Sequence, residues 1–174
     1  MDFFEKTIDE TLIFSGKIVK LSVQTVKLPN GEEAKREIVR HPGGVAVLAF
    51  KDDDTILMVE QFRKPFDRKM LEIPAGKLEP NEKPEVCGIR ELEEETGYKA
   101  GKFTYLGKIV SSPGFCDEWI YLYKAEELFL GKIGGDEDEF INLYEIKISE
   151  MKDMIKDGRI VDAKTISALT YYMI

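Results

Sequence analysis

The sequence GKLEPNEKPEVCGIRELEEETGY, residues 76–98, places four glutamates within five residues, shortly after a glycine-containing turn and a proline. Read as a helix that begins near Pro84, it brings Glu91, Glu94 and Glu95 together, because residues three and four positions apart share a helix face. Like charges at that spacing repel one another and weaken a helix. A solvated acidic face is one interpretation of such a run. The other is a bound divalent cation that offsets the repulsion.

The residues around the acidic run favour the cation. At roughly 100° per residue, Val86, Ile89 and Leu92 fall on the side opposite the three carboxylates, and we expect this apolar side to be buried. Arg90 precedes the run and can hold a carboxylate in place through its guanidinium group. Gly97 follows the run, where a C-cap glycine ends a helix. The helix is therefore expected to bury one side and to present carboxylates on the other.

Nine positions of this segment fit the spacing pattern G-x5-E-x7-R-E-U-x-E-E-x-G-U, in which U is apolar or aromatic. They are Gly76, Glu82, Arg90, Glu91, Leu92, Glu94, Glu95, Gly97 and Tyr98. This pattern is the signature of the Nudix hydrolases, and the sequence resembles that family at every fixed position. The resemblance extends over nearly the whole chain, is strongest from Pro42 to Asp117, and implies an α/β/α sandwich.

Composition sets the broad class of protein. A chain of 174 residues, 43% of them hydrophobic, is long enough for one ordinary domain with a substantial core. The net charge of −8 argues against nucleic acid or an anionic membrane as a main partner. Two isolated cysteines, Cys87 and Cys116, are typical of a reducing compartment rather than of a disulfide framework. The first ten residues are acidic and no apolar run approaches about 20 residues, so a cytoplasmic location is expected.

Strand-like segments occupy most of the chain, and helices close it. Alternation and turn signals predict strands at residues 17–28, 34–40, 44–50, 55–62, 70–73, 102–110, 118–125 and 140–148. Two amphipathic helices are expected near the end, one capped by Ser149 and ended by Gly158, the other following Asp162. These elements indicate an α+β layered domain with a mixed sheet. We expect residues 1–40 to form an N-terminal antiparallel β extension and residues 41–174 to form the Nudix domain.

Several carboxylates that face a cleft suit hard cations such as Mg²⁺ or Mn²⁺. Such a site favours hydrolysis of a phosphoanhydride, because the metal neutralises diphosphate oxygens, orients a water and stabilises the leaving phosphate. The resemblance implies that Glu91, Glu94 and Glu95 are metal ligands, with the backbone carbonyl of Ala75 as a further one. Glu82, in the loop before the helix, is expected to have an outer-sphere or structural role.

A base is needed to activate the water. The only histidine, His41, lies in an HPGG turn and is expected to be a turn residue. A carboxylate is therefore expected to act as the base, and Glu94 is assigned to catalysis as well as to the metal. The segment GGDEDEF, residues 134–140, resembles the loop that carries the catalytic glutamate in ADP-ribose pyrophosphatases. That resemblance makes Glu139 the candidate base and Glu137 the alternative, while a solvated acidic loop is the other interpretation.

Two features outside the glutamate segment point to ADP-sugars. Pro113, followed by Gly114, lies sixteen residues after Gly97. This offset resembles the ADP-ribose pyrophosphatase branch of the family, and a plain connecting loop is the alternative. The sequence EQFRKP, residues 60–65, resembles the diphosphate-binding arginine segment of the same branch. The guanidinium group of Arg63 suits diphosphate oxygens.

The segment KREIVRHPGG, residues 35–44, adds Arg36 and Glu37. Related enzymes use this segment, often from the partner subunit of a homodimer, to hold adenine. By that resemblance Arg36 would stack on the base and Glu37 would accept a hydrogen bond from the exocyclic amine. An exposed pair on an edge strand is the alternative for both residues. A long alternating strand near the N-terminus is consistent with a homodimer, because an exposed edge invites pairing.

The resemblance thus implies a Mg²⁺-dependent ADP-sugar diphosphatase, with Mn²⁺ as the alternative cation, that converts ADP-ribose and water to AMP and ribose 5-phosphate. A diphosphatase for another nucleotide sugar such as GDP-mannose is the nearest alternative, followed by dinucleoside polyphosphates as substrates. An ADP-ribose sensor that does not hydrolyse its ligand belongs to a different class. The sensor is disfavoured because such proteins tend to lose glutamates of the motif, whereas every one is present here.

Overall fold

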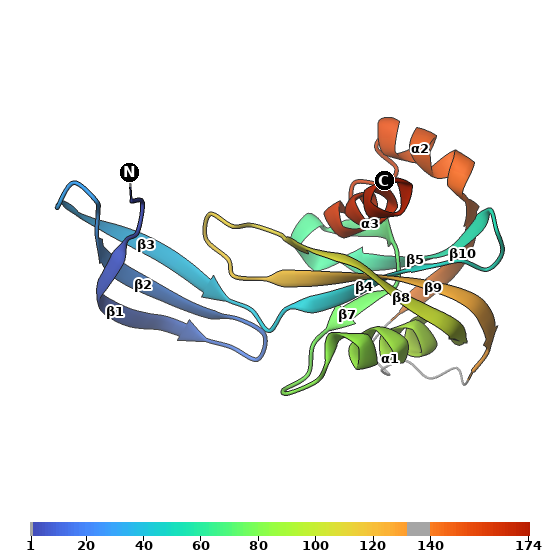
Figure 1. Cartoon of the computed structure of the whole chain (residues 1–174), viewed down its shortest axis with the longest axis horizontal. Coiled ribbons are helices and arrows are strands. Elements are labelled where there is room, and N and C mark those ends of the chain that lie inside the picture. Colours follow the sequence, from blue (N-terminus) through green and yellow to red (C-terminus); the bar gives the residue numbers. More distant parts are fainter. Residues whose placement is uncertain (1, 132–139) are drawn as a thin grey trace. The chain divides into compact units, whose positions relative to one another are not determined.

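The computed structural model describes residues 2–131 and 140–174, and the chain forms two compact units. The first comprises Met1–Gly43 with Val110–Trp119, and the second comprises Gly44–Ile109 with Ile120–Ile174. The three α-helices of the described chain, and a short 3-10 helix at Lys64–Phe66, belong to the second unit (Figure 1). Within the described ranges, no helix is long and apolar enough to cross a membrane.

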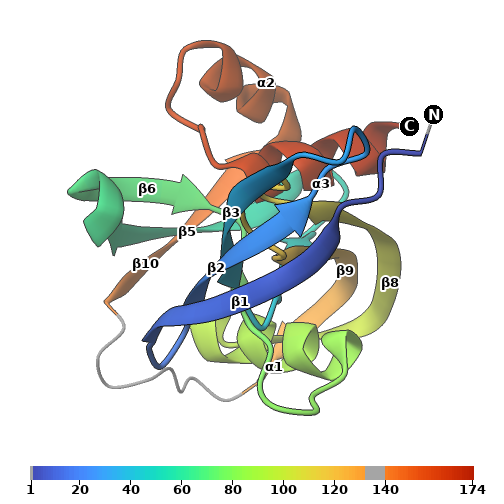
Figure 2. The ribbon, with the colours of Figure 1, turned by 90° about the vertical axis from the view of Figure 1, so that its left-hand side faces the viewer.

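The first unit is built on an antiparallel sheet with the strand order β1-β2-β3 (Figure 2). The bounds are β1 Lys6–Ser15, β2 Lys20–Lys27 and β3 Glu33–Arg40. β2 and β3 confirm two predicted strands, and they are joined through a turn in which Gly31 has a φ of 89°. β1 was not predicted, because its residues are all exposed and two register shifts interrupt its alternation.

The second unit contains a four-stranded sheet ordered β7-β4-β9-β8 and a three-stranded sheet ordered β10-β5-β6. The bounds are β4 Gly44–Ala49, β5 Thr55–Arg63, β6 Arg68–Glu72, β7 Ala75–Lys77, β8 Tyr98–Val110, β9 Trp119–Leu130 and β10 Ile141–Lys147. β4 is parallel to β9 and antiparallel to β7, so its sheet is mixed, as predicted. The all-apolar β4 is buried along its whole length, which is typical of a central strand.

Helices cover both faces of the four-stranded sheet (Figure 1). They are α1 Pro84–Thr96, α2 Ile148–Lys156 and α3 Ala163–Met173. Alternate residues of β4 serve two cores, because successive side chains of a strand point to opposite faces. Val45 and Val47 belong to the core that contains Leu92 of α1, whereas Ala46 and Leu48 belong to the core that contains residues of α2 and α3. This arrangement confirms the predicted α/β/α sandwich.

The buried side of α1 differs from the prediction. Val86 and Ile89 are 54% and 40% exposed, whereas the buried residues of the helix are Cys87, Gly88, Leu92 and Thr96. The prediction placed the carboxylates on the side of the helix opposite the buried one, facing a cleft. Instead the helix turns Glu91 toward β7, where its side chain is only 13% exposed. The buried side begins with the small residues Cys87 and Gly88, which are too weakly apolar for the sequence pattern to identify that side.

One of the two predicted N-caps is confirmed. The carboxylate of Asp162 accepts a hydrogen bond from the backbone N–H of Thr165 at 2.9 Å and caps α3. Ser149 is not a cap, because α2 begins one residue earlier, at Ile148. The N–H of Ile148 donates to the carbonyl of Asp54 at 2.9 Å, so a neighbouring loop satisfies one of the four N–H groups that have no partner within the helix.

Candidate active site

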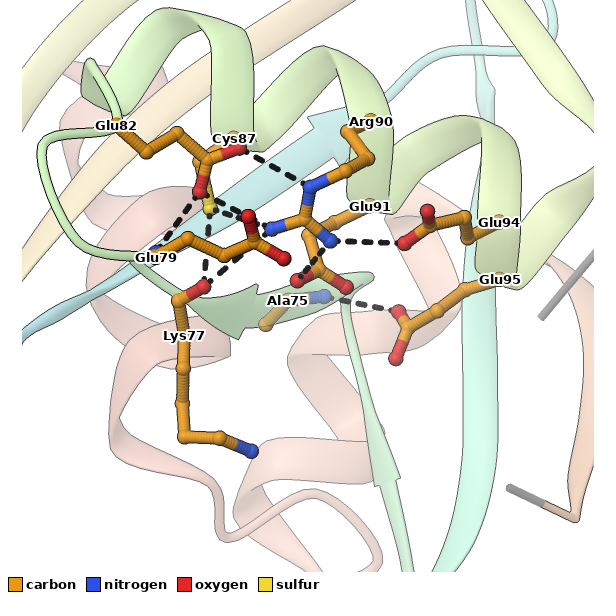
Figure 3. Close-up of polar contacts among 9 residues, drawn as sticks. All are labelled: Ala75, Lys77, Glu79, Glu82, Cys87, Arg90, Glu91, Glu94 and Glu95. Atoms are coloured by element: carbon orange, nitrogen blue, oxygen red, sulfur yellow. Dashed lines mark hydrogen bonds and ion pairs between the residues drawn. The ribbon is translucent and has the colours of Figure 1, made fainter. Parts of the chain in front are cut away.

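Helix α1 presents the glutamates of the motif beside β7 (Figure 3). The helix begins at Pro84, whose fixed backbone angle and missing N–H suit the first helical position. It is closed by Gly97, which has a φ of 75° and donates its N–H to the carbonyl of Glu93 at 2.8 Å. The predicted C-cap is therefore confirmed. Proline and glycine thus fix which residues form this helix.

Arg90 lies between the acidic side chains of the motif (Figure 3). Its Nε and Nη2 donate to the two carboxylate oxygens of Glu82 at 3.0 and 3.1 Å. Its Nη1 donates to Glu91 and to Glu94, each at 2.8 Å. These contacts raise the pKa of Arg90 above its usual value, with the hydrogen bond to Glu82 as the largest cause. One guanidinium group thus offsets repulsion among three carboxylates.

Glu82 is fixed from two directions. Besides the paired contact with Arg90, its Oε2 accepts the backbone N–H of Glu79 at 3.0 Å. The hydrogen bond from Arg90 is the largest effect that holds the pKa of Glu82 below its usual range. Glu82 therefore braces the loop that precedes α1 and fixes one edge of the arginine.

Gly76, before the helix, leaves room for the side chain of Glu91. A Cβ atom at Gly76 would lie 1.8 Å from the carboxylate carbon of Glu91, so no residue larger than glycine fits without displacing that side chain. On the neighbouring strand β4, a Cβ at Gly44 would lie 2.9 Å from the carbonyl oxygen of Gly76. The N–H of Ala75 donates to Glu95 at 2.9 Å. β7 is therefore held close against the acidic face of α1.

The donor set fits a hard divalent cation. Glu91, Glu94, Glu95 and the carbonyl group of Ala75 offer only oxygen atoms, which Mg²⁺ and Mn²⁺ prefer. Within residues 2–131 and 140–174, no three acidic, histidine or cysteine side chains are already gathered in a metal-binding arrangement. Arg90 occupies oxygens of two of the predicted ligands. A cation at this place would therefore share or replace the arginine's contacts.

A second charged cluster joins β5, β6 and the start of α3. Arg63 donates from Nε and Nη2 to the two oxygens of Glu72 at 2.8 and 2.7 Å. Lys164 also donates to Glu72, and to Asp162 at 3.0 Å. The hydrogen bond to Glu72 is the largest cause that raises the pKa of Arg63, and the charge of Glu95 adds to it. Arg63, the predicted phosphate-binding arginine, therefore interacts electrostatically with Glu95 of the motif.

Sequence reasoning missed Glu72 and Lys164. The available signal was one charged residue in the otherwise apolar run MLEIPA, because a lone carboxylate in a buried strand requires a cation. The lysine partner could not be found this way. It is distant in the sequence, and only the packing of α3 brings it to the strand.

Four of the five residues predicted to bind the substrate belong to the first unit, and the fifth, Arg63, belongs to the second. Arg36 and Glu37 are neighbours on β3, and the guanidinium group of Arg36 is held by Glu5 at 2.9 and 2.6 Å. Pro113 and Gly114 lie in the segment that pairs with β3 through Val39 and Cys116. The structure thus brings the proline loop beside the strand that carries Arg36 and Glu37.

His41 has the contacts of a turn residue. Its Nδ1 accepts the N–H of Gly43 at 3.1 Å, and its own N–H donates to Asp117 at 2.9 Å. The predicted bases Glu139 and Glu137 lie outside the described residues.

The described part of the second unit also contains a cavity of about 420 Å³ that holds none of the predicted site residues. It is lined by Phe50, Lys51, Asp52, Asp53, Lys102, Glu126, Glu127 and Tyr172. Its lysines are engaged locally, Lys102 with Glu126 at 2.9 Å and Lys51 with Glu145. Four acidic and two basic side chains give the lining a net negative charge, which disfavours an anionic ligand such as a nucleotide sugar.

Comparison with known proteins gives a consistent result. A model of the NUDIX domain matches residues 40–169. The chain is 52% identical over 171 residues to the methanol dehydrogenase activator of Bacillus methanolicus, covering 97% of this chain and 92% of that protein. It is 50% identical over 169 residues to the ADP-ribose pyrophosphatase of Bacillus subtilis (strain 168), covering 96% and 91%.

More distant relatives extend the comparison. The GDP-mannose pyrophosphatase of Yersinia enterocolitica is 38% identical over 149 residues, with 80% of this chain and 78% of that protein covered. Among solved structures, an ADP compounds hydrolase superimposes with a TM-score of 0.87 at 20% identity, covering 97% of this chain and 92% of that one. At that identity the structural match shows the shared fold.

Proposed function

The chain belongs to the Nudix family, and from this premise we propose that it hydrolyses the diphosphate bond of ADP-ribose to give AMP and ribose 5-phosphate. Related ADP-sugars would give AMP and the corresponding sugar phosphate. The observation that carries the choice of substrate is the 50% identity to the ADP-ribose pyrophosphatase of Bacillus subtilis along nearly the full chain. The complete set of motif glutamates on α1 supports hydrolysis rather than binding alone.

Glu91, Glu94, Glu95 and the carbonyl group of Ala75 would hold Mg²⁺, with Mn²⁺ as the alternative. When bound, the cation supplies charge neutralisation at the diphosphate and lowers the pKa of a water molecule. The protein's own contribution is orientation: Arg90 and the backbone of β7 hold the motif carboxylates at fixed positions.

Arg63 would bind the diphosphate group, because its charge lies near the motif and a guanidinium group matches phosphate oxygens. Arg36 and Glu37 would bind the adenine, and Pro113 and Gly114 would also contact the substrate. Glu139 would act as the base together with Glu94, and Glu137 is its alternative. If Glu137→Gln lowers kcat by orders of magnitude and Glu139→Gln does not, the base is Glu137.

A homodimer formed through the N-terminal β extension, residues 1–40, is part of the proposal. β1 is exposed along its length and carries exposed apolar side chains, among them Ile8, Leu12 and Phe14. Exposed apolar groups on a strand at the edge of a sheet are typical of a surface that pairs with another chain. The cytoplasmic location stays a prediction from the sequence.

Product identification tests the proposed reaction. Purified protein is incubated with ADP-ribose and Mg²⁺, and the products are identified by chromatography and mass spectrometry, with a chelator-treated sample as control. AMP and ribose 5-phosphate are expected only in the presence of the cation. Binding of ADP-ribose without any product would contradict the proposal and would make the chain a sensor.

A second candidate activity is favoured by the 52% identity to the methanol dehydrogenase activator. The chain could activate a dehydrogenase of that kind, in addition to hydrolysing a nucleotide sugar. The test adds the protein, or its Glu95→Gln variant, to a methanol dehydrogenase assay and measures the rate of alcohol oxidation. An unchanged rate with the unmodified protein would exclude this activity for the enzyme tested.

A further inference from the structure

Glu72 is a buried carboxylate for which the proposed chemistry has no use. Its side chain is 2% exposed, at the end of β6. Burial acts to raise the pKa of Glu72, but contacts with Arg63 and Lys164 outweigh it and hold the pKa below its usual range. Removing a carboxylate from water is energetically costly unless partners compensate. An ionised group kept at this position therefore needs a structural or functional reason.

The contact between Glu72 and Arg63 leaves part of the arginine available. Glu72 receives the N–H groups of one guanidinium edge, from Nε and Nη2. A guanidinium group has five N–H donors, so the edge formed by Nη1 and Nη2 can still bind two oxygens of an anion. The side chain of Arg63 is 36% exposed, which lets that second edge reach a ligand.

The position of Glu72 is itself fixed by α3. Lys164 donates to both Glu72 and Asp162, and Asp162 caps the helix through Thr165. The hydroxyl group of Thr165 in turn accepts the N–H of Ile73, the residue after Glu72, at 2.9 Å. The cluster of Arg63, Glu72, Asp162 and Lys164 holds two positive and two negative charges. It is therefore electrically balanced before any substrate binds.

We infer that Glu72 is a positioning residue: it orients Arg63 so that the second guanidinium edge receives the diphosphate of an ADP-sugar. The inference rests on the proposed function for the identity of the ligand. It goes beyond that function by assigning to Glu72, braced by Lys164, the alignment of the diphosphate-binding arginine. Glu72 itself does not touch the substrate.

A double-mutant cycle with a binding readout tests this role. Affinity for the non-hydrolysable α,β-methylene analogue of ADP-ribose is measured by calorimetry for the unmodified protein, Glu72→Asp, Arg63→Met and the double variant. Asp keeps the charge but is too short to hold both nitrogens. Loss of one charge-assisted contact is expected to weaken binding about 10- to 100-fold in each single variant. The double variant is expected to bind no more weakly than Arg63→Met, because Glu72 acts only through the arginine.

Two further variants complete the design. Glu72→Gln keeps the shape of the side chain and replaces Glu72→Asp in the cycle if that variant does not fold, as judged by thermal unfolding. Lys69→Gln is the matched control: Lys69 joins the same two strands through an exposed contact with Glu60 at 2.8 Å. This control is expected to bind the analogue as the unmodified protein does.

Three outcomes would overturn the inference. They are full analogue affinity in the Glu72 variant used in the cycle, an additional loss when Glu72 is changed in the Arg63→Met background, and unchanged affinity in Arg63→Met itself. Turnover of ADP-ribose by the unmodified protein is measured in parallel. Its absence would contradict the proposed function alone, because the binding cycle does not depend on hydrolysis.

Discussion

At the scale of single residues, Arg90 and Gly76 shape the candidate site. Arg90 contacts three acidic side chains, and the missing side chain at Gly76 lets Glu91 pack against β7. Both residues were identified from the sequence, because they are fixed positions of the motif. The pairing of Arg90 with Glu82 could not be assigned from spacing, because Glu82 lies in a loop that is held by its contact with the backbone of Glu79.

The metal assignment predicts a large effect at Glu95. In Glu95→Gln the amide oxygen can still accept the N–H of Ala75, so the fold is expected to persist, while the charge needed to bind a cation is lost. We expect kcat for ADP-ribose to fall at least about 100-fold. Mn²⁺ affinity, measured by electron paramagnetic resonance, is expected to fall as well.

Glu85→Gln is the matched control for this prediction, because Glu85 is exposed in the first turn of the same helix. Its kcat and Mn²⁺ affinity are expected to stay unchanged. Normal turnover in Glu95→Gln would refute the assignment of Glu95 as a metal ligand.

Arg90 also predicts how stability depends on pH. Because its hydrogen bond lowers the pKa of Glu82 from the usual 4.5, ionised Glu82 stabilises the fold fully above about pH 4.5. That contribution is lost as the pH falls through the lowered folded-state pKa. Arg90→Met removes it and leaves the motif carboxylates without a counter-charge. The variant is therefore expected to be less stable than the unmodified protein at pH 7, with a smaller difference in acid.

The free energy of unfolding in urea, measured at about pH 7, 4.5 and 3, checks this prediction. A constant difference between the two proteins across that range would show that Arg90 does not stabilise the ionised carboxylates.

At the scale of elements, the predictions that were confirmed concern a strand with a strong apolar pattern and a helix with a capping residue at its start. The all-apolar β4 and the α3 cap at Asp162 were predicted and are present. The buried side of α1 was predicted only in part, because Leu92 is buried as expected but Val86 and Ile89 are exposed. The close approach of β7 to α1 decides which side of the helix is buried. The residue pattern of the helix alone cannot predict that contact.

The corrected face of α1 predicts unequal costs for two truncations. Leu92 is fully buried in the core between α1 and β4, so Leu92→Ala is expected to lower the free energy of unfolding by about 2–5 kcal/mol. Ile89 is 40% exposed, so Ile89→Ala is expected to cost less than about 1 kcal/mol. Urea unfolding of both variants measures the two values, and equal costs would mean that the helix is turned differently.

At the scale of the whole molecule, the sequence predicted an α/β/α sandwich and an N-terminal β extension, and the structure contains both. The extension has a third strand, and the segment Val110–Trp119 joins the same compact unit. That association depends on pairing between Val39 and Cys116, which are far apart in the chain. Composition and local sequence patterns cannot predict a contact between residues so far apart in the chain.

The exposed first strand predicts the state of association. Leu12, which is 61% exposed, is expected to be covered in the proposed homodimer. Leu12→Glu would place a charge in that interface and is expected to shift the mass measured by light scattering from dimer toward monomer. Asp9→Asn, on the same strand, is the control and is expected to leave the mass unchanged. A monomeric unmodified protein would contradict the proposed assembly.

Competition between substrates tests the central claim most directly. Equal concentrations of ADP-ribose and GDP-mannose are mixed with the protein and Mg²⁺, and the nucleotide products are followed by chromatography. We predict that AMP and ribose 5-phosphate accumulate first and that GMP lags behind. Faster formation of GMP would contradict the ADP-sugar assignment while leaving the Nudix mechanism in place.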